Sequence, residues 1–171
     1  MLSNTETNFG TESPGTEDKK PSKILGVGLS VGLETVNVIV THFLSKRNES
    51  NDVDRLKQAN YVRSKILGMI NNFDHIVLMG DLNDLPDSPP LQRLIGLDDP
   101  EPNFIQTAVT TGPQAAFSYI FNNEKQLIDY ILLSPSLQPS FQTSDINERH
   151  QTIDIGPVSD HRGVMVNFML N

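Results

Sequence analysis

The sequence predicts a mixed α/β (α+β) fold, and three observations carry that prediction. Residues 24–40 alternate apolar and polar side chains, as half-buried strands do. Residues 53–70 place apolar side chains every three to four positions, which is the period of a helix with one buried face. Residues 76–79 are consecutive apolar residues between polar ones, which favours a strand covered on both faces.

The first two strands are expected as a β-hairpin. Apolar residues alternate from Ile24 to Val31 and from Val36 to Val40, and Gly32-Leu33-Glu34 is short enough to connect them. Before this hairpin, residues 1–22 are mostly Ser, Thr, Glu, Asn, Gly and Pro, a composition typical of disordered segments. We therefore expect a disordered tail or linker over residues 1–22 and one domain over residues 23–171.

The most regular element is the expected helix, which Asp52 can cap and which ends at Asn71-Asn72. Its apolar face is formed by Val53, Leu56, Ala59, Val62, Ile66 and Ile70. The opposite face, expected to be polar and solvated, is formed by Asp54, Arg55, Lys57, Arg63 and Lys65. The buried strand 76–79 follows this helix.

Further elements are expected after that strand. Ser88 before Pro89-Pro90 predicts a short helix through Ile95, with Gly96 at its end. The other expectations are a short strand over 104–109, a second hairpin of 117–121 and 127–133 joined by 122–125, an irregular segment over 141–155, and a closing strand over 164–170.

Composition limits the function classes. The chain has 171 residues, enough for one domain, and 21 acidic against 13 basic residues give a formal charge of −8. Such a surface repels long polyanions, which argues against a broad electrostatic grip on duplex DNA. No apolar run approaches the roughly 20 residues of a membrane-spanning helix. The amino terminus does not resemble a signal peptide. We expect a cytoplasmic protein if the chain is complete; a fragment of a longer precursor would allow secretion.

Chemically capable side chains gather at the expected strand ends. Asp81 and Asn83 lie two positions apart just after the strand 76–79, so an extended backbone projects both to one side. The carboxylate can hold a hard divalent cation or orient a water molecule, and the amide can donate to a phosphate oxygen. On their own, these two residues are more simply explained by an ordinary Asx turn.

Four more residues extend this pattern. Asp129 lies in the apolar run 127–133, where a buried carboxylate is costly unless something pairs with it, and histidine is the usual partner. Asp160-His161 introduces the last expected strand and His42 ends an earlier one. Each residue alone is more simply a strand-end acid or a surface histidine, but the ordered set is hard to explain in that way.

The set resembles the endonuclease/exonuclease/phosphatase superfamily. The motifs that carry the resemblance are Thr41-His42, Gly80-Asp81-Leu82-Asn83-Asp84, Ile128-Asp129-Tyr130-Ile131-Leu132 and Ser159-Asp160-His161. The helix opening Arg55-Leu56-x-Gln58-Ala59 looks like that of nuclease-like members. The family fold is a four-layer sandwich, in which two packed sheets have helices outside.

The resemblance implies a divalent-metal-dependent phosphodiester hydrolase, nuclease-like, in which water attacks phosphorus in one in-line step. Asp81 then activates the attacking water, and Asn83 holds that water and the phosphate. Asp129 orients His161, which contacts the scissile phosphate. His42 matches a histidine that binds phosphate or the leaving group.

The resemblance also implies Asp160 and Asp81 as metal ligands, Mg²⁺ or Mn²⁺ as the ion, and no organic cofactor. The implied partner is a phosphate-ester substrate, with nucleic acid as one candidate and no membrane span. A phosphomonoesterase, a lipid phosphodiesterase and a non-catalytic fragment that binds a partner remain as alternatives.

One departure from the family pattern concerns the amino terminus. Family members begin with a strand that bears an asparagine and continue to a strand-end glutamate, the principal metal ligand. Residues 1–23 contain no match, because Glu6, Glu12 and Glu17 lie in the polar tail. We therefore expect the carboxyl-terminal part of a family domain without its amino-terminal strands, with weak Mg²⁺ binding and with self-association through uncovered strands.

Overall fold

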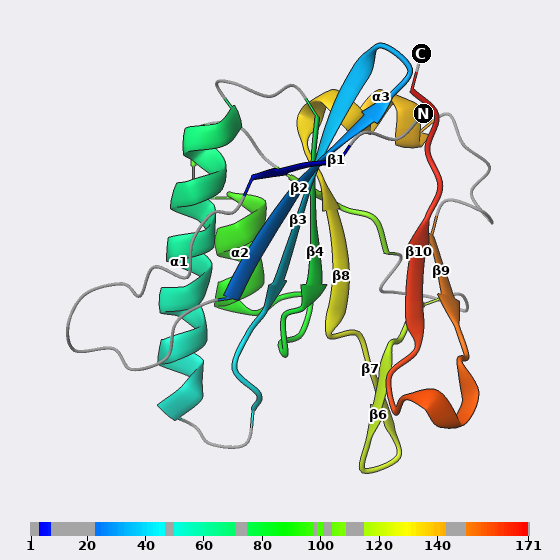
Figure 1. The fold of residues 1–171 in the computed structure, drawn as a ribbon. Helices are drawn as coiled ribbons and strands as arrows, with labels where there is room; N and C mark the ends of the chain where they lie inside the picture. Colours follow the sequence, from blue (N-terminus) through cyan, green and yellow to red (C-terminus); the bar gives the residue numbers. More distant parts are fainter. Residues whose placement is uncertain are drawn as a thin grey trace.

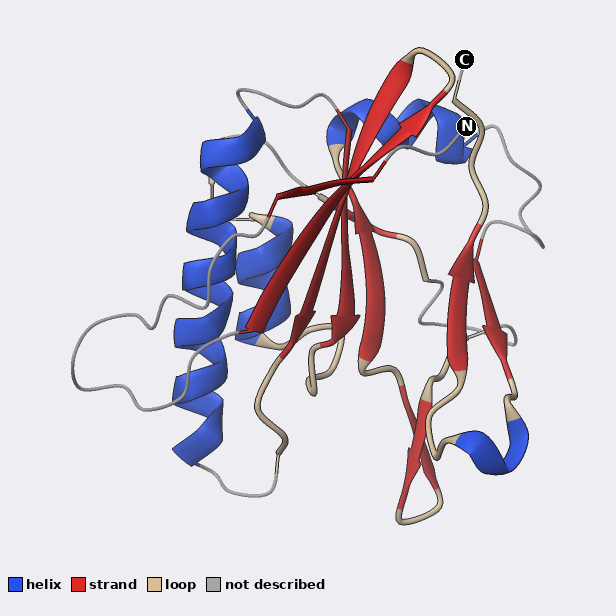
Figure 2. Ribbon diagram, viewed as in Figure 1, coloured by secondary structure: helices blue, strands red, loops and turns tan. Residues whose placement is uncertain are grey.

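A six-stranded sheet forms the centre of the fold. It has the strand order β1-β2-β3-β4-β8-β5, and α1 and α2 lie beside each other against one of its faces (Figure 1). Two smaller sheets, β6-β7 and β9-β10, lie on the β8 side (Figure 2). The mixed α/β prediction is confirmed. The structure is a computed structural model, which describes residues 4–7, 23–46, 50–70, 75–97, 99–100, 104–108, 115–142 and 150–170.

The first hairpin is confirmed. β2 (Lys23–Val31) and β3 (Glu34–His42) are antiparallel neighbours, and Gly32 turns the chain between them with a φ of 63°, which glycine adopts without steric cost. β1 (Asn4–Thr7) pairs antiparallel with β2. Residues 4–7 thus form a strand where a disordered tail was expected, and the rest of that tail lies outside the described residues.

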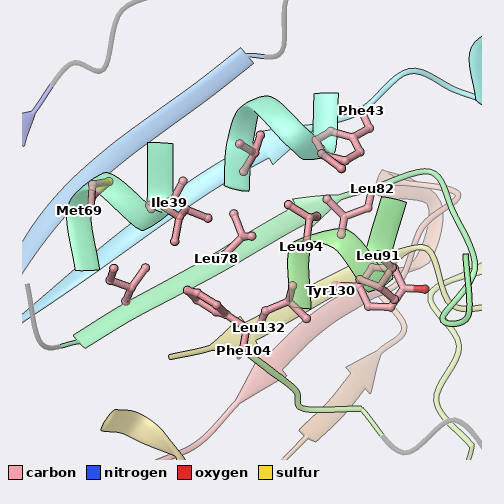
Figure 3. Close-up of a cluster of buried hydrophobic side chains, with 14 of the residues drawn as sticks. Ile39, Phe43, Met69, Leu78, Leu82, Leu91, Leu94, Phe104, Tyr130 and Leu132 are labelled. Carbon is pink, nitrogen blue, oxygen red and sulfur yellow. The ribbon is translucent and has the colours of Figure 1, made fainter. Parts of the chain in front are cut away.

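α1 (Ser50–Ile70) joins β3 to β4 (His75–Asp81), and β4 runs parallel to β3. The helix begins two residues before the predicted cap, and its last residue, Ile70, directly precedes the predicted end at Asn71-Asn72, which lies outside the described residues. Its residues Ala59, Val62 and Ile66 are buried in the core between the helices and the sheet. Figure 3 shows part of this core, including Met69 of α1. This core fixes the direction in which β3 and β4 reach the site.

The charged face of α1 differs from the prediction. Arg55 and Arg63 were expected in solvent, but they are 1% and 0% exposed, while Val53 of the predicted apolar face is 61% exposed. The reason is that each arginine pairs with a carboxylate of a neighbouring loop, Asp84 and Asp99 respectively. A buried guanidinium is tolerated only with such a partner.

The second hairpin was predicted with the wrong strands. β6 (Tyr119–Phe121) pairs with β7 (Glu124–Gln126), and the turn between them places Asn122 and Asn123 at φ 51° and 66°, which asparagine tolerates. The apolar run after it becomes β8 (Asp129–Leu133), which pairs antiparallel with β4 and with β5 (Ile105–Gln106). Its apolar side chains are buried in the main sheet, which stabilises them more than an exposed hairpin would.

The carboxyl-terminal region also differs in part. β9 (His150–Ile153) lies in the segment that was expected to be irregular. The sequence did not predict it because its residues lack a strong apolar alternation; the strand forms by pairing with β10 (Gly163–Val166). The observed closing strand, β10, ends at Val166 and is shorter than the predicted strand 164–170. α2 (Pro89–Ile95) is confirmed, and Gly96 ends it with a φ of 82°. η1 (Pro135–Leu137), α3 (Gln138–Gln142) and η2 (Gly156–Val158) complete the elements.

A second apolar cluster lies on the face of the sheet opposite α1. Val36, Val77 and Leu133 are buried there against partly buried residues of β10 and of the segment after it. The four-layer sandwich, the missing strands and the self-association through uncovered strands stay predictions. Within the described part of the chain, no helix is long and apolar enough to cross a membrane.

Candidate active site

The topology of three strands brings the predicted residues to one edge of the sheet. β3 is parallel to β4, so their carboxyl ends, with His42 and Asp81, lie at the same edge. β8 is antiparallel to β4, so it starts where β4 ends, and Asp129 is the register partner of Asp81. Residues distant in the sequence therefore meet at the lower end of the sheet in Figure 1.

Asp81 and Asn83 form one hydrogen-bonded unit. The Asn83 N–H donates to Asp81 Oδ1 at 2.8 Å, and Asn83 Nδ2 lies 3.1 Å from Asp81 Oδ2 and 3.1 Å from the Phe43 carbonyl oxygen. Asn83 has a φ of 51°, a conformation in which asparagine is enriched. Asp81 and Asn83 thus form the Asx turn that the simpler explanation predicted. In addition, the hydrogen bond from the Asn83 side-chain amide to Phe43 connects the loop after β4 to the loop after β3.

Gly80 allows β3 and β4 to approach each other closely at the site. Its φ is 145°, and a Cβ built there would lie 1.8 Å from the Thr41 carbonyl oxygen. One residue further, the Phe43 N–H donates to the Asp81 carbonyl oxygen at 2.9 Å. His42 consequently lies beside Asp81, with Nε2 3.4 Å from Asp81 Oδ2 and with its side chain 66% exposed.

Asp129 and His161 form a hydrogen-bonded pair. His161 Nδ1 lies 2.8 Å from Asp129 Oδ2, and the Tyr119 ring packs on the imidazole with a centroid separation of 4.8 Å. The fully buried Ser118 fixes both partners: its Oγ accepts the Asp129 N–H at 3.0 Å, and its carbonyl oxygen accepts the Arg162 N–H at 2.7 Å. The segment that carries His161 is thus attached to the start of β8.

The electrostatics of the site are set by two carboxylates that face each other. Burial raises the pKa of Asp81, and the negative charge of Asp129 raises it further, against the opposing effects of the Asn83 N–H and of His42 and His161. Burial alone would lower the pKa of His161, but the hydrogen bond to Asp129 and the nearby carboxylates raise it above its ordinary value. A proton acceptor and a proton donor thus lie side by side.

The donor set can be tested for its fit to a cation. One ligand atom each of Asp81, Asp129 and His161 lie within 4.8 Å of one another. Two half-buried carboxylates that face each other concentrate negative charge at one point, and a hard divalent cation prefers such oxygen ligands. Asp160, predicted as a ligand, lies outside this group; it is exposed and lines the rim of the same pocket.

A pocket of about 750 Å³ opens above these residues. His42, Asp81, Asn83 and His161 are among the polar residues that line it. Its other walls come from the loop after β3, from α1 and from the β6-β7 hairpin, and they include Lys46, Gln58, Tyr119, Phe121 and Gln126. The volume suits a substrate of nucleotide size.

The family follows from a sequence comparison. The model of the endonuclease/exonuclease/phosphatase family matches residues 15–161. The chain belongs to this family. No curated protein matches the chain in sequence.

Solved structures agree with this family in fold. NExo, a 3′ phosphatase from Neisseria bound to a product DNA hairpin, matches with a TM-score of 0.66 at 14% identity. The match covers 90% of this chain and 67% of the NExo chain. Truncated TDP2 from Caenorhabditis elegans has a TM-score of 0.62 at 14% identity, over 96% and 64%. Beta toxin from Staphylococcus aureus has a TM-score of 0.55 at 12% identity, over 90% and 59%. The chain thus spans about two thirds of these structures or less.

Sequence reasoning missed several residues that shape this candidate site. Ser118 and Tyr119 lie in the predicted hairpin, but no spacing rule separated them from ordinary strand residues. Lys46 follows the strand that ends at His42; it ion-pairs with Asp84 at 3.2 Å and lines the pocket. The buried pairing of Arg55 with Asp84 had a signal, since the same arginine belongs to the helix motif that resembles nuclease-like members.

Proposed function

We propose that this chain is a divalent-metal-dependent phosphodiester hydrolase, nuclease-like, that uses water as its nucleophile. One observation carries the proposal: Asp81 faces the Asp129–His161 pair across β4 and β8, at the base of a pocket, in a chain of the endonuclease/exonuclease/phosphatase family. The residues around Asp81 supply an acceptor for a proton, donors for phosphate oxygens and space for a substrate.

Asp81 is proposed to take the proton of the attacking water. Its raised pKa makes it a stronger base than an exposed carboxylate. Asn83 holds this carboxylate through both its backbone and its side-chain N–H groups. The base therefore has one fixed orientation toward the pocket, which reduces the entropic cost of reaching the reactive geometry.

His161 is proposed to contact the scissile phosphate. With Nδ1–H donated to Asp129, the Nε2–H remains to donate to a phosphate oxygen, and the raised pKa favours the charged imidazolium. His42 lies on the other side of Asp81, exposed toward the pocket, where it contacts a phosphate oxygen or protonates the leaving oxygen.

Asp81 and Asp129 are proposed to face a Mg²⁺ or Mn²⁺ ion, with Asp160 at the pocket rim as a further carboxylate. A bound divalent cation would neutralise negative charge on the phosphoryl oxygens. His161 Nδ1 already bonds to Asp129, so this nitrogen is a poor candidate for a metal ligand. Hard divalent cations also prefer oxygen atoms, which the carboxylates supply. Two carboxylates are few for a cation that prefers six oxygen ligands, so the expected affinity is weak.

Nucleic acid is the substrate class we propose first. The pocket combines a cationic Lys46 with the rings of Tyr119 and Phe121, and aromatic rings stack on bases of any sequence. The acidic chain favours a short or single-stranded substrate over a long duplex. A lipid phosphodiester is the second candidate, because Ile120 and Phe121 of the β6-β7 hairpin are 53% and 52% exposed beside the pocket.

The experiment compares hydrolysis of four substrates with Mg²⁺ or Mn²⁺ and with a chelator: plasmid DNA, a single-stranded oligonucleotide, sphingomyelin vesicles and a phosphomonoester. Metal-dependent cleavage of the oligonucleotide supports the proposal. Cleavage of the vesicles alone supports the lipid candidate, and release of phosphate from the monoester alone supports a phosphatase. Absence of metal-dependent hydrolysis of every substrate would contradict an enzymatic role for this chain.

A further inference from the structure

Three buried polar residues of α1 form a stripe along the helix, which we call the α1 polar stripe: Asn51, Arg55 and Gln58. They are separated by four and three positions, so they point to the same side of the helix. Their exposed fractions are 6%, 1% and 4%. Polar side chains this buried are rare unless they form hydrogen bonds.

Each member of the stripe bonds to the loop that follows β3. Asn51 Nδ2 donates to the Ser45 carbonyl oxygen at 2.7 Å, and Arg55 Nη1 donates to the Leu44 carbonyl oxygen at 3.4 Å. Gln58 Oε1 accepts the Leu44 N–H at 3.0 Å. The backbone directly after His42 is thus held by α1.

Arg55 also holds the loop that follows β4. Its Nε donates to Asp84 Oδ2 at 2.9 Å, and Asp84, itself 6% exposed, lies directly after Asn83. Tyr130 Oη donates to the Asp84 carbonyl oxygen at 2.9 Å, which fixes the same loop from β8. One guanidinium therefore joins the two loops that carry the site.

We propose that Arg55, with Asn51 and Gln58, is a positioning residue that sets the separation of His42 from Asp81 and Asn83. The two loops meet at the Phe43 carbonyl oxygen, which accepts from Asn83 Nδ2, and at the Phe43 N–H, which donates to Asp81. Arg55 holds both loops against the same helix, so its loss lets the loops move apart. This inference rests on the proposed function for its kinetic consequence, but its structural consequence is independent of that function.

The chain offers a matched control on the same helix. Arg63 is 0% exposed, its Nε donates to Asp99 Oδ2 at 3.0 Å, and its Nη1 donates to the Leu94 carbonyl oxygen at 3.2 Å. Arg55 and Arg63 are thus equally buried, and each donates to a carboxylate and to a backbone carbonyl oxygen. Arg63 attaches α2 and the loop after it, however, and not the loops of the site.

The test measures the variants Arg55→Met and Arg63→Met by two readouts. We expect both to lose stability in urea unfolding, because each removes a buried guanidinium that donates to a loop carboxylate and to a backbone carbonyl oxygen. Only Arg55→Met should show faster amide exchange at Phe43 and Leu44. Only Arg55→Met should lose kcat, by about 10–100-fold with a smaller change in KM, as is typical for residues that orient catalytic groups.

Equal losses of kcat in the two variants, or unchanged amide exchange at Phe43 and Leu44 in Arg55→Met, would overturn the inference. If Arg55→Met does not fold, Asn51→Ala replaces it, since Asn51 does not line the pocket and its loss should still speed exchange in residues 43–46. Unchanged exchange in that variant would also overturn the inference. If the wild-type protein hydrolyses no phosphodiester, the proposed function fails, and the exchange measurements still decide the positioning role.

Discussion

Replacing Asp129 by Asn tests the charge relation on which the site depends. The variant keeps the shape of the side chain, and its carbonyl oxygen can still accept the His161 Nδ1–H that now lies 2.8 Å from Asp129 Oδ2. Only the negative charge is lost. Because burial lowers the pKa of His161 and the carboxylates raise it, that pKa must fall in Asp129→Asn.

The magnitude follows from the kind of hydrogen bond. Bonds to a charged partner contribute about 1.5–3 kcal/mol and neutral ones about 0.5–1.5 kcal/mol. The pair is mostly buried, with 27% and 19% of the two side chains exposed, so the difference between the midpoints of these ranges, roughly 1.2 kcal/mol, applies nearly in full. That difference corresponds to about an eightfold loss in kcat/KM at the pH of maximum activity.

The pH profile gives a second readout with a definite sign. In Asp129→Asn the alkaline limb should move to lower pH with the pKa of His161, and the acidic limb should also move to lower pH, since Asp81 loses the like charge that raises its pKa. Asp154→Asn is the control, because Asp154 is 76% exposed and pairs with Arg162 instead. A His161 imidazole that titrates unchanged by NMR in chelator, or an unmoved alkaline limb, would refute the pairing.

Three further predictions concern stability. Gly80→Ala should destabilise the fold by at least about 2 kcal/mol, because Gly80 has a φ of 145° and an added Cβ would lie 1.8 Å from the Thr41 carbonyl oxygen. The control is Gly68→Ala in α1, where an added Cβ has no neighbouring atom within 4 Å and should stabilise the fold by roughly 0.4–1 kcal/mol. Urea unfolding measures both variants. Burial lowers the pKa of His150, so at this residue the unfolded chain binds more protons as the pH falls through about 6.5, and the wild type should lose stability relative to His150→Asn as the pH falls from 7.5 to 5. Mg²⁺ at ten times its Kd should add about 1.4 kcal/mol to the unfolding free energy, and a chelator should remove this gain. An alanine at 80 as stable as glycine, the same pH dependence of stability in the wild type and His150→Asn, or no effect of Mg²⁺ would contradict the respective prediction.

The elements predicted from periodicity are those whose environment is uniform along their length. The hairpin of β2 and β3, the helix α1 and the strand β4 have a regular apolar pattern, and a pattern reports burial directly. β9 has no such pattern, since His150 and the residues after it become a strand through pairing with β10. The run 127–133 was apolar enough for a strand, but periodicity does not show which strand is its neighbour.

The candidate site was predictable as a set of residues and less so as a geometry. The order of the motifs placed His42, Asp81, Asn83, Asp129 and His161 in one family site, and the structure brings them to one edge of the sheet. The sequence could not show that Arg55 is buried, because a charged residue on the polar face of a helix is normally solvated. Its partner Asp84 is separated from it by 29 residues, and only tertiary packing pairs them.

The most direct test of the proposed site is the replacement of Asp81 by Asn in a Mg²⁺-dependent assay on a single-stranded oligonucleotide. We predict that kcat falls by about 10²–10⁴-fold, as is typical for loss of a general base. The free energy of unfolding should stay constant or rise slightly, because the like charge facing Asp129 is removed. Hydrolysis at the wild-type rate by the folded, purified Asp81→Asn variant would contradict the assignment of this site.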